Sequence, residues 1–202
     1  MGNQFSYAQR TLRLAVESFK DHQIVSRDDI GGRWAIARRD ADGRIRGDYY
    51  TEIISLHRGR LFVGGDIDDC TFGYYSSGKD EDPRKLHRDK VRWIGETNDI
   101  PYYVRQKAAI GMTDGYRLTT EYDAATARQQ IQERIDCAKD DENLRNIYQD
   151  ALDYTDSSEA LQEYFSDHPD IREAFGDVTS SRVIFAWAAC NRLCLLFKED
   201  AV

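Results

Sequence analysis

The sequence predicts an α+β fold in which an N-terminal helix and an antiparallel β-meander pack with a C-terminal helical half. Three observations predict it. Residues 5–20 carry apolar side chains three and four positions apart, which is the spacing of one helix face. Residues 33–75 hold short strand-like runs separated by glycine-containing turns. From Asp123, a suitable N-cap, the helical spacing returns and continues through most of the remaining chain.

The strands of the first half follow one another closely along the chain. They are expected at residues 33–38, 45–56, 61–63 and 71–75. Asp42-Gly43 is a strong hairpin signal between the first two. Because such turns leave no room for crossover helices, the sheet is expected to be antiparallel.

The remaining elements are expected to be mainly helical. After a polar loop at residues 76–83, two short helices and a short strand are expected at residues 85–94, 101–112 and 116–120. Five further helices are expected at residues 124–139, 144–154, 158–168, 169–175 and 181–197. The last of these is apolar almost all round, which indicates burial in the core.

The length of 202 residues suits one α+β domain over residues 1–202. Near residue 120 the sequence pattern changes from strand-rich to helical, and the net charge differs between the two halves. The sheet-rich half, residues 1–120, contains 20 lysines and arginines against 18 aspartates and glutamates, a net charge of +2. The helical half, residues 121–202, contains 8 against 18, a net charge of −10. Such a field disfavours direct nucleic-acid binding by the helical half and favours a basic partner.

Several classes of protein are disfavoured by the composition. No apolar run approaches the about 20 residues needed to span a bilayer, and the first residues lack the features of a secretory signal, so a cytoplasmic protein without a membrane partner is expected. The four cysteines form no CxxC pair and have no histidines at zinc-ligand spacing, which predicts reduced thiols. The sequence predicts no cofactor and no catalytic residue, and a homodimer stays open.

The most acidic segment, residues 121–177, contains 16 acids and 5 lysines and arginines. Carboxylates spaced along helices can imitate phosphates and occupy the basic groove of a partner protein, with tyrosines as rigid anchors. Ordinary solvated helix faces explain the same composition. The candidate partner-binding residues are Asp140, Asp141, Glu142, Tyr148, Asp150, Asp153, Tyr154, Glu159 and Glu163.

A second candidate site is the acidic loop after the third predicted strand. Asp66, Asp68 and Asp69 are three carboxylates within four positions, and His57 lies one hairpin away. Clustered carboxylates can hold Mg²⁺ or Mn²⁺ for phosphoryl chemistry, so a metal-dependent phosphodiesterase or nuclease is the alternative function. A solvated turn with aspartate caps is the simpler interpretation.

A third candidate is a set of arginines and aromatic residues on the first strands. Arginines interleaved with aromatic rings on an open sheet can hold a nucleotide or a single strand of nucleic acid. An edge strand protected by charges is the competing interpretation, because aspartates are mixed in. The set comprises Arg33, Trp34, Arg38, Arg39, Arg44, Arg46, Tyr49, Tyr50, Arg58 and Arg60.

Three segments together resemble uncharacterised proteins encoded in bacteriophages and prophages. They are the strand-like run around Trp34, the run RLFVGGD at 60–66 with Phe72 after it, and the run SRVIFAWAA at 181–189. The resemblance implies an accessory or host-takeover factor, of which anti-CRISPR inhibitors of bacterial immunity are one kind. The resulting hypothesis is a non-enzymatic phage-type protein that binds a host protein through its acidic helical surface and inhibits or modulates it.

Overall fold

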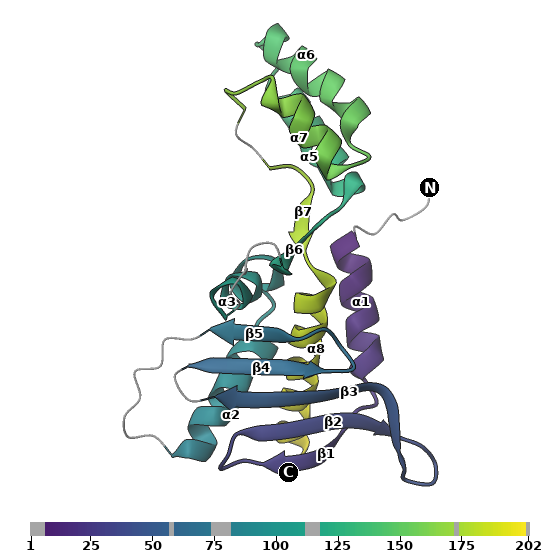
Figure 1. Cartoon of the computed structure of the whole chain (residues 1–202), viewed down its shortest axis with the longest axis vertical. Helices are drawn as coiled ribbons and strands as arrows, with labels where there is room; N and C mark the ends of the chain where they lie inside the picture. The colour runs from purple at the N-terminus through teal and green to yellow at the C-terminus, as the bar shows by residue number, and fades with distance from the viewer. Residues whose placement is uncertain (1–6, 57–58, 74–81, 112–117, 172–173, 201–202) are drawn as a thin grey trace. The chain divides into compact units, whose positions relative to one another are not determined.

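The computed structural model describes residues 7–56, 59–73, 82–111, 118–171 and 174–200 (Figure 1). By its internal contacts the chain divides into two compact units. We call residues 11–119 with 179–202 the sheet unit, and residues 1–10 with 120–178 the helical unit. Each unit is considered by itself. The fold class is α+β, which confirms the prediction.

The sheet unit is built on a five-stranded antiparallel meander in which each strand pairs with the next along the chain. Its strands are β1 (Gln23–Asp28), β2 (Arg33–Arg39), β3 (Ile45–Leu56), β4 (Arg60–Gly65) and β5 (Cys70–Gly73). The meander confirms the predicted topology. Strand β1 was not predicted, because it is an edge strand with only two apolar residues, Ile24 and Val25, and so lacks a clear alternation.

The turn between β2 and β3 shows why the hairpin signal was informative. The carboxylate of Asp40 accepts hydrogen bonds from the backbone N–H groups of Asp42 and Arg44, at 3.0 and 2.8 Å. Gly43 has a φ of 78°, a left-handed conformation that glycine adopts without steric cost. The turn therefore depends on one aspartate and one glycine.

Helix α8 (Ser181–Glu199) supplies much of the core of the sheet unit. In Figure 1 it runs behind the five strands together with α2 (Pro83–Gly95). Its buried side chains join one apolar cluster with those of the sheet, and the Phe197 ring meets Trp34 edge to face at 5.5 Å. The helix was predicted as a core helix, and it packs in the sheet unit although the sequence grouped it with the acidic helices.

Helices α2 and α8 approach each other closely at Gly95. A Cβ atom added there would lie 2.5 Å from the carbonyl oxygen of Cys190. Asn191 donates a side-chain hydrogen bond to the Gly95 carbonyl at 2.6 Å, and the Trp187 indole donates to the Thr97 carbonyl at 3.0 Å. Glycine is thus required for this contact between the two helices.

The other helices of this region match the predictions approximately. Helix α1 (Tyr7–Phe19) confirms the first predicted helix, with its first turn counted in the helical unit. The helix predicted at 101–112 begins as a π-helical turn, η1 (Ile100–Val104), and continues as α3 (Arg105–Gly111). None of the helices in the described parts of the chain is long and apolar enough to cross a membrane.

The helical unit has a separate small core. Its elements are β6 (Thr120–Tyr122), α5 (Ala124–Cys137), α6 (Glu142–Ala151), η2 (Leu152–Tyr154), α7 (Ser158–Ser166) and β7 (Asp177–Thr179), of which Thr179 belongs to the sheet unit. Side chains of Asp123, Asp141 and Ser157 cap the three α-helices at their N-termini. The buried apolar residues of α5, α6 and α7 form a cluster of their own with Phe175.

Two predictions in this unit were wrong. The described residues of the helix expected at 169–175 form a turn and irregular backbone, because Pro169 follows two turn hydrogen bonds and Gly176 has a φ of 83°. Of the strand expected at 116–120, residues 116–117 lie outside the described residues, and only Thr120 falls in a strand, β6, which pairs with β7. Strand β7 is only three residues long, so it left no pattern in the sequence.

Candidate functional site

The predicted acidic residues of the helical unit lie at its surface. Asp140, Asp141 and Glu142 are exposed at the connection between α5 and α6, where Asp141 also accepts the N–H of Leu144 at 2.9 Å. Glu159 and Glu163 are exposed four residues apart on α7, one helical turn from each other. None of these five carboxylates forms an ion pair with another described residue.

The end of α6 combines exposed carboxylates with an aromatic ring. Asp150 and Asp153 are exposed, and Tyr154 keeps 43% of its surface exposed while its ring stacks on Tyr164 at 4.7 Å. The hydroxyl of Tyr164 donates to the Ile147 carbonyl at 2.9 Å, and this hydrogen bond holds the Tyr164 ring in place. Burial, and then the charge of Asp150, raise the pKa of Tyr164. Tyr154 is therefore an exposed ring on a fixed support.

Tyr148 is not a surface anchor, in contrast to the prediction. It is 5% exposed and belongs to the core of the helical unit, with edge contacts to Phe165 and Phe175 at 6.3 and 6.1 Å. Leu144, Tyr148 and Ala151 repeat at helical spacing on the inward face of α6. That spacing was the signal in the sequence that could have placed Tyr148 in the core.

The acidic loop does not bring its carboxylates together around one point. Asp66 accepts the backbone N–H of Tyr50 at 2.8 Å, Asp68 lies 3.9 Å from Arg182, and the Asp69 carboxylate lies against Gly64. Within the described ranges there is no group of three histidine, cysteine or acidic residues placed to hold a metal ion. The donor set does not fit the predicted Mg²⁺ or Mn²⁺ site, while His57 lies outside the described residues.

The arginine and aromatic residues of the first strands do not form an open stacking surface. Trp34 is 2% exposed, and its indole N–H donates to Asp29 at 2.9 Å. Tyr49 is partly buried and stacks on Phe185 at 5.8 Å against the core of the sheet unit. Arg38 donates to the carbonyl of Ser18 at 2.9 Å. The arginines Arg33, Arg39, Arg44, Arg46 and Arg60 are exposed, Tyr50 is half-buried, and Arg58 lies outside the described residues.

The three thiols of the sheet unit are buried. Burial raises the pKa of Cys70 and of Cys194 to about 12, and burial also raises that of Cys190. These three cysteines pack as small apolar residues, as the sequence predicted, while Cys137 in the helical unit is exposed.

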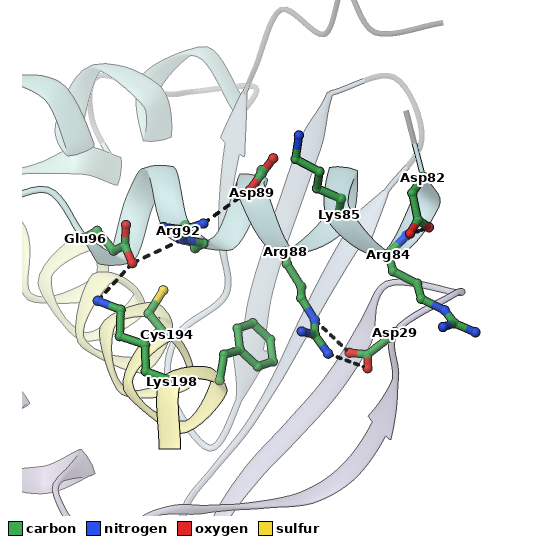
Figure 2. A pocket seen from close by; sticks show the side chains of 11 residues that line it. Asp29, Asp82, Arg84, Lys85, Arg88, Asp89, Arg92, Glu96, Cys194 and Lys198 are labelled. Carbon is green, nitrogen blue, oxygen red and sulfur yellow. Dashed lines mark hydrogen bonds and ion pairs between the residues drawn. The ribbon is translucent and has the colours of Figure 1, made fainter. Parts of the chain in front are cut away.

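A pocket of about 600 Å³ in the sheet unit was not predicted (Figure 2). Helix α2, the end of α8 and Asp29 from the turn between β1 and β2 form its walls. Its charged lining residues are Asp29, Asp82, Arg84, Lys85, Arg88, Asp89, Arg92, Glu96 and Lys198, and Cys194 and Phe197 complete it. The four-residue spacing of Arg84, Arg88 and Arg92 was its only signal in the sequence.

Two carboxylates in this pocket each hold two cations. Asp29 accepts Arg88 and Arg27, both at 2.8 Å, together with the Trp34 indole. Partial burial alone would raise the pKa of Asp29, but the hydrogen bonds from Arg88, Trp34 and Arg27 lower it to about 2. Glu96 accepts Arg92 at 3.2 Å and Lys198 at 3.1 Å, which lowers its pKa against the opposing effect of burial.

The comparisons with known proteins identify no relative. The chain matches no protein-family model, no curated protein and no solved structure. The chemistry of the described residues is therefore the basis for a functional proposal.

Proposed function

We propose that the protein is a non-enzymatic binding protein whose helical unit docks its acidic surface on the basic surface of a partner protein. The main observation that supports this proposal is that the excess of acidic residues coincides with one compact unit. The helical unit contains 6 lysines and arginines against 16 acids, a net charge of −10, whereas the sheet unit contains 22 against 20, a net charge of +2.

Some acids of the sheet unit are neutralised by cations, whereas, within the described residues, the acids that dominate the charge of the helical unit are not. In the sheet unit, Asp29 and Glu96 are each neutralised by two cations. In the helical unit, Asp140, Glu142 and Asp150 are exposed and have no ion pair with a described residue. Uncompensated like charges on a small unit repel one another and reduce its stability. A basic partner would relieve that repulsion, which supports a binding role for this surface.

Tyr154 supplies the most suitable anchor on this surface. Its ring is exposed, follows Asp153 in the chain and is supported by the stacked ring of Tyr164. A ring that is already fixed loses little conformational entropy when it binds, and tyrosine is among the residues that dominate interface energies. The proposal therefore assigns Tyr154 as an anchor and the carboxylates around it as the source of long-range attraction.

The partner class follows from this chemistry. A groove rich in lysine and arginine, of the kind that otherwise holds a phosphate backbone, is complementary to carboxylates spaced along helices. Direct binding of nucleic acid by the helical unit is disfavoured by the same charge. That the partner is a host protein in the bacterial cytoplasm, such as an immune effector, rests on the resemblance to phage-encoded proteins alone.

The test compares the full tagged chain with two variants in capture from nuclease-treated bacterial lysate. The first variant neutralises four acids of the helical unit and spares Asp141, which caps α6. Its substitutions are Asp140→Asn, Glu142→Gln, Asp150→Asn and Asp153→Asn. The control variant removes the same charge from exposed acids of the sheet unit. Its substitutions are Asp21→Asn, Asp42→Asn, Asp48→Asn and Glu52→Gln.

The expected result is a protein captured by the unmodified chain and by the control variant, and lost with the first variant. Its affinity should also fall as the salt concentration rises, because exposed charges are screened. Identical capture by all three proteins would exclude the acidic surface as the binding site. A Tyr154→Ala variant of the full chain should weaken the same capture without removing any charge.

A further inference from the structure

We infer that the pocket between α2 and the end of α8 binds a small ligand that carries phosphate groups, of the size of a nucleotide or an inorganic polyphosphate. All residues that line it belong to the sheet unit. The inference is thus independent of the function proposed for the helical unit. Its volume of about 600 Å³ lies within the range of roughly 300–1,000 Å³ typical of small-ligand sites.

Each carboxylate of the pocket has a cation or a backbone N–H group as a partner. Asp29 and Glu96 each hold two cations, as described above. Asp89 lies 3.7 Å from Arg92, and the Asp82 side chain accepts the Arg84 backbone N–H at the start of α2. The charged lining consists of five cations and four acids, so its formal net charge is +1. This balance favours an anionic ligand.

Among the cations that line the pocket, Arg84 and Lys85 have no ion pair with any described residue. Both are exposed and lie in the first turn of α2, which contains no acidic residue. The N-terminal end of a helix carries partial positive charge, which the capping carboxylate of Asp82 offsets here in part. A bound anion would further compensate the charges of Arg84 and Lys85.

Arg88 is held in place before any ligand arrives. Its Nε and Nη2 groups donate to Asp29, and its guanidinium lies 4.9 Å from the centre of the Phe197 ring. Its other N–H groups have no partner among the described residues. A guanidinium fixed in this way matches the oxygen geometry of phosphate without losing further side-chain entropy.

The length of the cationic row indicates more than one phosphate group. Arg84, Arg88 and Arg92 follow one side of α2, and Figure 2 shows Arg88 and Arg92 in ion pairs with Asp29, Asp89 and Glu96. Eight residues of helix span about 12 Å. A single carboxylate would use only one arginine, whereas a diphosphate or triphosphate can reach several of these donors.

The test is calorimetric titration of the full chain with inorganic pyrophosphate at low ionic strength. The variant Arg84→Gln/Lys85→Gln should bind pyrophosphate at least about tenfold more weakly, because it loses the two unpaired cations. The control variant Arg44→Gln/Arg60→Gln removes the same charge from an exposed turn position and an exposed strand position of the same unit and should bind within about twofold of the unmodified chain. Tryptophan fluorescence should show that both variants remain folded.

Two further probes identify the source of the phosphate. Tighter binding of ATP than of pyrophosphate would assign a nucleotide, and equal binding would assign the phosphate groups alone; adenosine should not bind in either case. The inference is overturned if millimolar pyrophosphate does not bind the unmodified chain, or if the control variant loses as much affinity as the α2 variant.

Discussion

Replacing Asp29 by asparagine tests how much the sheet unit depends on one carboxylate. Asp29 accepts hydrogen bonds from Arg27, Arg88 and the Trp34 indole, and these lower its pKa from 3.8 to about 2. The difference corresponds to about 2.4 kcal/mol of interaction with the charged form. The Asp29 side chain is 20% exposed and that of Arg88 is 34% exposed, so solvent screening reduces the expected loss to about 1–2 kcal/mol.

The contribution of Asp29 to the free energy of unfolding should depend on pH. A carboxyl whose pKa is lowered in the folded state stabilises that state at pH values above its unfolded pKa, and the contribution disappears as the pH falls towards the folded pKa. For Asp29 the contribution should be complete above about pH 5 and should disappear between about pH 4 and pH 2. The free-energy difference between the unmodified chain and Asp29→Asn should follow the same course.

The assay is urea unfolding followed by tryptophan fluorescence at several pH values. All three tryptophans, Trp34, Trp93 and Trp187, belong to the sheet unit, so the signal reports that unit. Asp42→Asn removes the same charge from an exposed position that has no ion pair with a described residue, and it should change stability by less than about 0.5 kcal/mol. The reasoning would be refuted if the difference in free energy of unfolding between the unmodified chain and Asp29→Asn stayed constant down to pH 2.5, or if it were absent at pH 7.

Three more expectations concern the core, a turn and a thiol. Ile131→Ala, at a fully buried position of the helical unit, should lower the free energy of unfolding by about 2–5 kcal/mol, measured by circular dichroism. A loss below about 1 kcal/mol would contradict the burial of Ile131 in that core. Gly43→Ala should cost about 1 kcal/mol because of its φ of 78°, whereas Gly47→Ala, equally open but at ordinary φ, should be nearly neutral in the same unfolding assay. A thiol reagent at pH 8 should label Cys137 in the folded protein and all four cysteines after denaturation; rapid labelling of a second folded thiol would contradict the burial of the others.

The fold could be predicted where local sequence determines structure. Strand β3 occupies the predicted residues 45–56, because its length and the Asp42-Gly43 turn leave little choice of register. Strand β1 and strand β7 could not be predicted, because one has few apolar residues and the other is three residues long. Both exist only through pairing with a partner that the sequence does not identify.

The candidate sites depend even more than the strands on contacts between residues far apart in the sequence. Trp34 was correctly placed in a strand, but its burial depends on Phe197 from a helix far along the chain. The pocket depends on Arg88 and Asp29, which are 59 residues apart in sequence and 2.8 Å apart in space. No periodicity encodes such a pair. In contrast, the acid excess is a local property of the sequence, and it coincides with the helical unit.

The position of α8 in the chain has a consequence for how the protein is made. The sheet strands lie between residues 23 and 73, yet the helix that buries their apolar face begins only at Ser181. During synthesis, the strands therefore emerge long before their cover, and their apolar residues stay open to aggregation or to chaperones. The continuous segment 120–178 has most of its contacts within itself and can fold first. The core of the sheet unit can be completed only after α8 has been synthesised.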